Sequence, residues 1–308
     1  MDRFRGLGRP RRKIEAVAAP STLPPPIQAQ IDAPAPLRLW HLTSLDAPTV
    51  AVAWCLAFAW VARIVLPLWL PAVLALAAWS FYVADRLLDA RAGLISSANS
   101  QFPSTSLLRP RHYFHWRHRR VFLPIAIVAA VVAASLVLHS MPVAARARNS
   151  VLALAAVAYF ASVHSPGRLR PAQLRFPKEL LVGVLFTLAC TLPVWTRAAH
   201  RELLVIPILI FAALAWLNCL AIETWESGQR ARSLLFHRML TLGAFAAASS
   251  AACIAIHQLR PALLLGAAAV SAVLLALLDR HRESFEPTTL RAAADLVLLT
   301  PLALLLLP

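Results

Sequence analysis

Long runs of apolar residues, each ended by charged residues, recur along the chain and predict its secondary structure. A helix needs about 20 apolar residues to cross the hydrocarbon core of a bilayer. Nine segments reach or approach that length, which predicts an all-α integral membrane protein with about nine transmembrane helices. They fall near 49–64, 67–88, 121–138, 151–163, 179–195, 203–222, 239–256, 262–278 and 292–307.

The stretches between these runs hold most of the basic residues, and this distribution predicts the topology. Short loops rich in Lys and Arg stay on the cytoplasmic side of a membrane. With the N-terminus inside, 24 of the 30 Lys and Arg residues fall in cytoplasmic segments. We therefore expect a protein of a bacterial-type inner membrane, with the N-terminus in the cytoplasm and the C-terminus outside.

The first 40 residues differ from the rest of the chain. They are rich in Pro, basic at the start, and lack the apolar core of a signal peptide. This composition predicts a disordered cytoplasmic tail at 1–40. A transmembrane helical domain is expected to follow at 41–308.

The overall composition agrees with a membrane protein. Hydrophobic residues make up 59% of the 308 and charged residues only 14%, which is too apolar for an ordinary soluble domain of this length. The formal net charge is +16, but the basic residues flank the apolar runs. Topology and anionic lipid headgroups explain that charge, so nucleic acid is not an expected partner. The four cysteines lie in apolar runs without CxxC spacing, which indicates neither a disulfide framework nor a structural zinc site.

Carboxylates that close two of the apolar segments form the first candidate site. Asp85 and Asp89 are four residues apart, so a helix would place them on one face, where their oxygens can share a hard cation. Glu223 and Glu226 close the sixth segment. In the expected topology these four acids and Lys178 lie at the cytoplasmic face. They predict a site for a metal and a diphosphate; the alternative is a set of ion pairs at the membrane surface.

These features resemble the UbiA family of intramembrane prenyltransferases. The resemblance is carried by the acidic helix ends, the nine apolar segments, and the stretch from Tyr159 through Phe176-Pro177-Lys178-Glu179-Leu180-Leu181-Val182-Gly183. In that family two Asp-rich motifs face each other across a cytoplasmic-side cavity and hold magnesium against an isoprenyl diphosphate. A Tyr followed by a Lys, between the fourth and fifth helices, is also typical of it. The resemblance covers roughly Leu37 to the C-terminus and implies a UbiA-like bundle.

The first Asp-rich motif is only partly retained. In the family it reads N-D-x-x-D-x-x-x-D. When its last two Asp are placed on Asp85 and Asp89, Phe81 and Tyr82 stand where the Asn and the first Asp would be.

The second motif is thinner still. Its acidic positions fall on Asn218, Ile222 and Glu226, with Glu223 out of register. Mg²⁺ usually takes one or two carboxylates plus substrate phosphates, so a reduced set is still compatible with binding. The alternative is a transport or scaffold protein that keeps the fold without the reaction.

The resemblance implies a role for each candidate residue. The expected enzyme moves an isoprenyl group from its diphosphate to an aromatic or lipid-like acceptor, assisted by Mg²⁺. Lys178 would neutralise the leaving diphosphate, and Tyr159 would stabilise the cation or orient the acceptor. The implied metal ligands are Asp85, Asp89, Glu223 and Glu226, and the implied substrate-binding residues are Arg117, Arg119, Arg120 and Asn218.

Two further features have no place in the family pattern. His112, His115 and His118 recur every three residues in the stretch 111–120, which would suit a transition metal. The arginines around them repel cations, so a basic interfacial helix that caps the cavity and meets an anionic partner is favoured. Asp295 lies about one turn into the last apolar segment, where a carboxylate needs a polar partner that the sequence does not identify.

Overall fold

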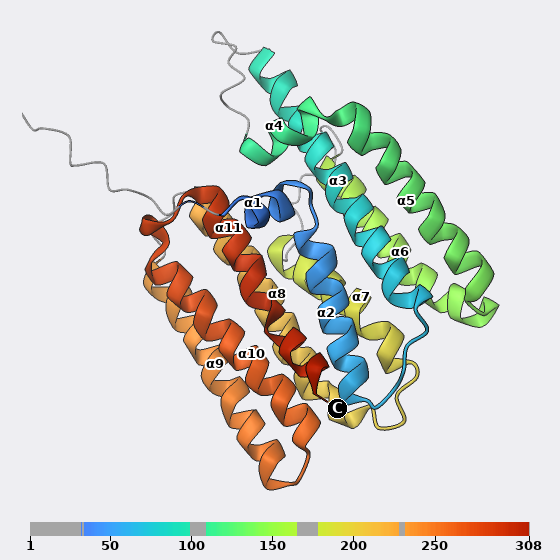
Figure 1. The fold of residues 1–308 in the computed structure, drawn as a ribbon, viewed down its shortest axis with the longest axis vertical. Helices are drawn as coiled ribbons and strands as arrows, with labels where there is room; N and C mark the ends of the chain where they lie inside the picture. Colours follow the sequence, from blue (N-terminus) through green and yellow to red (C-terminus); the bar gives the residue numbers. More distant parts are fainter. Residues whose placement is uncertain (1–31, 33, 99–108, 165–177, 228–231, 308) are drawn as a thin grey trace, which may run out of the picture.

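A computed structural model of the chain describes residues 32, 34–98, 109–164, 178–227 and 232–307. Within these ranges the protein is all-helical, without a β-strand. The long helices run side by side, with α9 and α10 at one side of the bundle and α5 at the other (Figure 1). They are α3 (Trp69–Ala98), α5 (Arg119–Ser140), α6 (Val143–His164), α7 (Lys178–Trp195), α8 (Glu202–Ser227), α9 (Arg232–Ala255) and α10 (Leu259–Arg280).

Shorter helices complete the bundle. Two of them, α1 (Ala35–Leu42) and α4 (Pro110–Arg117), lie at the end where α3 and α10 end and α11 begins (Figure 1). The others are α2 (Asp46–Val61), the 3-10 turn η3 (Arg282–Ser284), and α11 (Pro287–Leu296) with its 3-10 continuation η4 (Val297–Leu306).

Length and hydropathy make most of these helices candidates for crossing a membrane. Seven of the described helical segments qualify, or eight if α1 and α2 count as one span broken by a bend of 89°. The chain is therefore an all-α protein with several apolar helices suited to membrane insertion. Each of the nine predicted segments overlaps a helical element, but α6, which carries Arg146 and Arg148 near its start, is not among the seven. The count of nine spans stays a prediction.

Two boundaries differ from the sequence prediction. The second segment was expected to end near residue 88, but α3 continues to Ala98, so Asp85 and Asp89 lie within a helix and share one face of it. The helix α1 begins at Ala35, inside the last residues of the predicted tail. Most of that tail, 1–31 and 33, lies outside the described residues.

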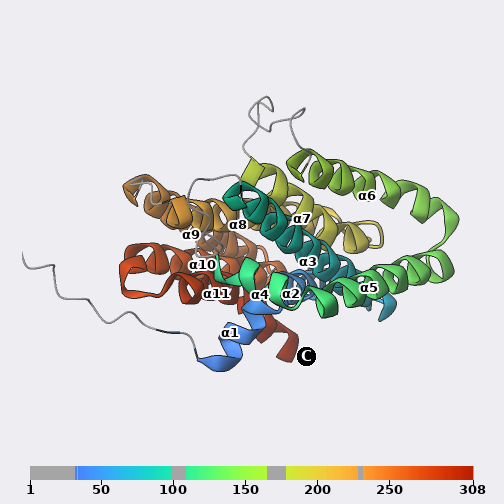
Figure 2. The ribbon, with the colours of Figure 1, turned by 90° about the horizontal axis from the view of Figure 1, so that it is seen from above.

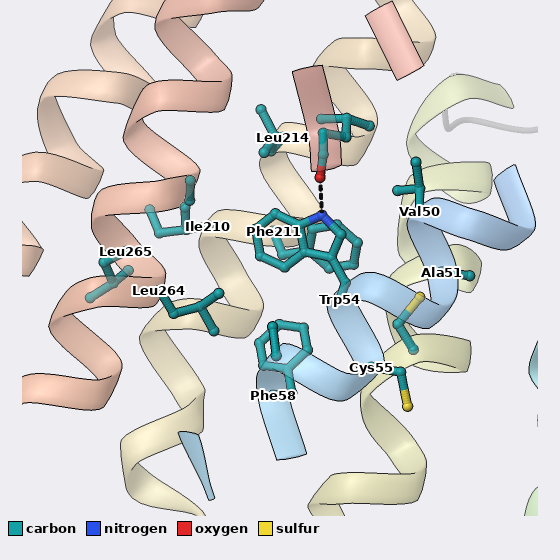
Figure 3. Packing of buried hydrophobic residues seen from close by; sticks show 14 of the residues in the cluster. Val50, Ala51, Trp54, Cys55, Phe58, Ile210, Phe211, Leu214, Leu264 and Leu265 are labelled. Atoms are coloured by element: carbon teal, nitrogen blue, oxygen red, sulfur yellow. Dashed lines mark hydrogen bonds between the residues drawn. The ribbon is translucent and has the colours of Figure 1, made fainter. Parts of the chain in front are cut away.

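The centre of the bundle is an aromatic cluster that joins α2 to α8 (Figure 3). The rings of Trp54 and Phe211 stack with their centroids 4.0 Å apart, and Phe58 meets Phe211 edge-on. All three side chains are fully buried. Trp54 Nε1 donates a hydrogen bond of 2.9 Å to the carbonyl of Leu298, which satisfies a polar group that burial would otherwise make costly. This bond ties η4 to α2.

Two helices differ sharply in how closely they pack. A Cβ atom built on Gly183 of α7 would lie 2.8 Å from the backbone nitrogen of Trp216 in α8, so only Gly fits there. None of the described residues of α6, in contrast, is buried. Figure 2 shows α6 at the edge of the bundle. Its described contacts include an edge-on pair between Phe160 and Phe81 of α3.

Candidate functional site

Two acidic residues of α3 and one histidine of α6 form a cluster that we call the carboxylate cluster: Asp85, Asp89 and His164. One ligand atom from each lies within 4.8 Å of the other two. Nε2 of His164 is 3.5 Å from Oδ1 of Asp85 and 3.5 Å from Oδ1 of Asp89. Both carboxylates are nearly half exposed, whereas the His164 side chain is 12% exposed. The acids are therefore open to a ligand while the imidazole is held in place.

The hydrogen bonding of His164 fixes its ring chemistry. Nδ1 lies 3.0 Å from the carbonyl oxygen of Phe160, and because a carbonyl only accepts, Nδ1 carries the proton and donates it. Nε2 is buried and makes no hydrogen bond to the described residues. In the neutral ring Nε2 presents a lone pair to two carboxylates, which is repulsive. A proton on Nε2 or a metal ion among the three groups relieves that repulsion.

Lys178 and Glu223 lie near each other at the same end of the bundle. Nζ of Lys178 is 3.3 Å from Oε2 of Glu223 and 3.6 Å from Oε1 of Glu179. The side chains of Lys178 and Glu223 are 48% and 43% exposed. Tyr159 of α6 lies within electrostatic range of Asp85 and Glu179. Of the predicted catalytic pair, Tyr159 thus lies near the carboxylate cluster, and Lys178 contacts Glu223.

Glu226 has a different environment from the other acids. Its carboxylate accepts hydrogen bonds from Arg109, Arg111 and Arg291, which come from the start of α4 and from α11. Its side chain is 19% exposed. Three guanidinium groups around one carboxylate disfavour a metal ion there. The predicted metal role of Glu226 stays a prediction, and its contacts belong to an arginine-rich site.

A cavity of about 760 Å³ opens beside Glu226. It lies between α4, the end of α8, η3 and the start of α11, and we call it the basic cavity. Its charged or ionisable lining residues are His41, Arg109, Arg111, Glu226, Arg282, Glu283 and Arg291.

Asn218 and Asp295, whose partner the sequence does not identify, bind each other. Nδ2 of Asn218 donates to Oδ1 of Asp295 over 3.1 Å. Asn218 was predicted to bind substrate; in the structure it pairs with Asp295, a partly buried acid of α11.

A cluster of buried charged residues lies beside this pair. Asp46 lies 2.6 Å from Nδ1 of His41 and accepts a hydrogen bond of 3.2 Å from Arg86. Ligand atoms of His41, Asp46 and Asp295 lie within 4.8 Å of one another. With the guanidinium of Arg86 against Asp46, this group has the character of a structural ion pair.

The three histidines of the stretch 111–120 do not converge. His112 of α4 lies 3.8 Å from Asp89, and His115 hydrogen-bonds Ser44 at 3.1 Å, while His118 is exposed. Burial, followed by the charge of Arg111, lowers the pKa of His112 to about 3. Burial lowers the pKa of His115 to about 4. Both rings are neutral near pH 7. The predicted role of this stretch, a basic interfacial helix that caps the cavity and meets an anionic partner, stays a prediction.

The three arginines predicted to bind substrate lie apart from the basic cavity. Arg117 is exposed. Arg119 packs over the ring of Trp116 at 4.6 Å and donates to its carbonyl. Arg119 and Arg120 line a second cavity of about 410 Å³, with which the basic cavity shares no residue.

Sequence reasoning missed the residues that complete both sites. His164 is the last residue of α6. The available signal in the sequence was its position, since it is a polar residue at the end of an apolar run, as Asp85 and Asp89 are. Arg109, Arg111 and Arg291 counted only as topological charges, since nothing in their spacing links them to Glu226.

Comparisons with known proteins found no match for this chain. No family model, no curated protein and no solved structure matches the chain. The resemblance to the UbiA family therefore rests on the residues named above.

Proposed function

We propose that the chain is a membrane-embedded prenyltransferase of the UbiA type, which moves an isoprenyl group from its diphosphate to an aromatic or lipid-like acceptor. One observation carries the proposal: Asp85, Asp89 and His164 converge at the end of a bundle of apolar helices. Such a cluster suits a metal-bound diphosphate, and the apolar helices suit a prenyl chain. The proposal includes nine spans and a cytoplasmic position for the cluster.

The donor atoms fit a divalent metal. Two carboxylates suit Mg²⁺, and the unpartnered Nε2 of His164 adds a nitrogen donor, which Mn²⁺ accepts more readily than Mg²⁺ does. When bound, the metal would neutralise charge on the departing diphosphate. Asp85, Asp89 and His164 would hold it.

The neighbouring residues have separate tasks in this proposal. Lys178 donates a hydrogen bond to the leaving diphosphate oxygen as the carbon–oxygen bond breaks. To do so it gives up its ion pair with Glu223, whose carboxylate lies 3.3 Å away. Tyr159, within electrostatic range of Asp85, is the candidate to stabilise positive charge on the allylic carbon through its ring. The surrounding apolar helices keep water from that carbon.

A second candidate function has its own supporting observation. Glu226, at a position where the family's second motif carries an acid, is bound by three arginines. That arrangement favours a protein of the same architecture that transports or scaffolds without prenyl transfer. Metal binding at the carboxylate cluster without transfer of any prenyl group would support this alternative.

The experiment is a transfer assay with the full chain in lipid nanodiscs. Labelled isoprenyl diphosphates of several chain lengths are offered with a panel of aromatic and lipid alcohol acceptors, in Mg²⁺, Mn²⁺ or a chelator. We expect transfer that the chelator abolishes and that Asp85→Asn and Asp89→Asn each lower at least about 100-fold, because no spare carboxylate remains. Glu202→Gln, an exposed acid at the opposite end of α8, is the matched control. Full transfer in chelator would refute the proposal.

A further inference from the structure

The basic cavity carries an excess of positive charge. Four guanidinium groups line it, those of Arg109, Arg111, Arg282 and Arg291, against the carboxylates of Glu226 and Glu283. Arg111 is 9% exposed, and the side chains of Arg282 and Arg291 are 13% and 21% exposed. Cations held together with so little water repel one another unless an anion compensates them. Glu226 and Glu283 supply only two negative charges against these four positive ones.

Two hydrogen-bond donors of this lining have no acceptor among the described residues. Nε of Arg291 and Nη1 of Arg282 are buried and make no hydrogen bond. Nη1 of Arg282 lies 3.7 Å from Oδ1 of Asp279, close enough for an ion pair but too far for a hydrogen bond. A buried donor without an acceptor costs free energy. An oxyanion in the cavity would compensate the charge of both arginines.

The rest of the lining is apolar. Ile222, Trp225, Phe285 and Leu290 contribute to the wall. Trp225 is fixed in orientation, because its Nε1 donates a hydrogen bond of 2.8 Å to Asp279. The cavity lies where α8 and α10 end and α11 begins, which is the level at which the headgroups of a bilayer would meet the bundle. A ligand with a charged head and an apolar body fits both parts of the wall.

We infer that the basic cavity binds the phosphate group of an amphiphilic ligand, at a site separate from the carboxylate cluster. A phosphate group carries up to two charges and three free oxygens, and guanidinium groups bind such oxygens in pairs. Glu226 occupies the arginines when the ligand is absent, and the phosphate competes with it for them. The inference does not depend on prenyl transfer, since its test measures binding alone.

The test begins with the full chain in maltoside micelles, which contain no phosphate. Thermal unfolding is followed by tryptophan fluorescence in inorganic phosphate and in chloride at equal ionic strength. We expect Tm to rise with phosphate concentration, since a ligand of the folded state stabilises it. Arg282→Gln should weaken binding about tenfold, the effect of one charge-assisted hydrogen bond. Arg280→Gln, an exposed neighbour outside the cavity, should leave the affinity unchanged.

A lipid arm identifies the source of the phosphate. Phosphatidic acid is added to the micelles and compared with diacylglycerol, which has the same body without the phosphate. If the natural ligand is a lipid, phosphatidic acid raises Tm at far lower concentration than inorganic phosphate does. If the two act alike, the site takes a soluble phosphate and the amphiphilic nature of the ligand is overturned. The inference is overturned if neither raises Tm, or if Arg280→Gln and Arg282→Gln weaken binding equally.

Glu226→Gln provides an independent check of the competition. Removing the resident charge frees the arginines, so the variant should bind inorganic phosphate about tenfold more tightly than the unmodified protein. Weaker binding by a variant that still unfolds cooperatively would mean that Glu226 holds the arginines in place for some other purpose, and the inference would fail.

Discussion

At the scale of single residues, His164 has the most direct consequence for the proposed metal site. Its Nδ1 is committed to the carbonyl of Phe160, so Nε2 is the only ring nitrogen free for a ligand. Asp85 and Asp89 were already linked by their spacing of four residues. The histidine adds a third ligand atom, which lies within 4.8 Å of an oxygen of each carboxylate.

The first prediction is that His164→Ala weakens Mn²⁺ binding about tenfold or more and weakens Mg²⁺ binding less, because the lost donor is a nitrogen. Binding is measured from the free Mn²⁺ signal in electron paramagnetic resonance. His118→Ala is the matched control, since Nδ1 of that exposed histidine also lies within hydrogen-bond distance of the carbonyl four residues earlier. Equal Mn²⁺ affinity in the two variants would exclude His164 as a ligand.

Residue-level prediction from the sequence succeeded where a local rule applies and failed where packing decides. A spacing of four places Asp85 and Asp89 on one helical face whatever the rest of the fold does. The meeting of His164 with those acids, and of Arg291 with Glu226, depends on how helices far apart in the sequence pack. A single sequence holds no local signal for such contacts.

The second prediction concerns pH and the buried histidines of α4. Burial lowers the pKa of His115 to about 4 and that of His112 to about 3, whereas in the unfolded chain both titrate near pH 6.5. Above about pH 6.5 both imidazoles are neutral in the folded and the unfolded state, so they do not lower the free energy of unfolding. As the pH falls below that value, the unfolded state takes up protons first, and the free energy of unfolding decreases progressively toward about pH 4.

We expect Tm to decrease on acidification below about pH 6.5, and His115→Gln to make that decrease shallower. His118→Gln, at an exposed position, should retain the full slope. The measurement is a series of thermal unfolding curves across this pH range. Identical slopes for all three proteins would show that these imidazoles are already protonated or exposed when folded.

At the scale of elements, the apolar pattern of the sequence did not predict how closely α7 and α8 approach each other. The pattern located the long helices because a bilayer requires apolar length. It gave no sign that Gly183 contacts the backbone of Trp216. It also missed the 89° break between α1 and α2, where Ser44 has a φ of 62° that most residues avoid.

The third prediction follows from that approach. Gly183→Ala should destabilise the protein by about 1–3 kcal/mol, because a Cβ atom 2.8 Å from a backbone nitrogen forces α7 and α8 apart. Gly266→Ala is the control, since the nearest atom to its Cβ would be Oγ of Ser250 at an ordinary 3.7 Å. That change should be neutral or slightly stabilising. The free energies of unfolding of the two variants, measured in mixed micelles, distinguish these outcomes.

At the scale of the whole molecule, chemistry-bearing residues gather at one end of the bundle. The carboxylate cluster, the pair of Lys178 and Glu223, and the basic cavity lie toward the end of the bundle where α6, α8 and α10 end and where α7 and α11 begin (Figure 1). The distribution of basic residues predicts that this end faces the cytoplasm. Orientation in a membrane is a separate property from the fold and needs its own measurement.

The fourth prediction tests that orientation on a single helix. Arg201 and Ser227 are exposed and bracket α8, whose 26 residues span about 39 Å. In a background with the four native cysteines replaced, Arg201→Cys should react with an impermeant maleimide on intact cells. Ser227→Cys should react only after the cells are opened. The reverse pattern would place the carboxylate cluster and the basic cavity outside.

The exposure of α6 gives the surrounding lipid a structural role at the proposed metal site if this helix crosses the membrane as proposed. This helix carries both His164 and Tyr159, yet none of its described residues is buried within the protein. Acyl chains around α6 would then add to the packing of Phe160 against Phe81 in holding the imidazole near α3. Stripping lipid with harsh detergent should release the metal while α2, α8 and α10 stay packed, and adding lipid back should restore binding without any refolding of the core.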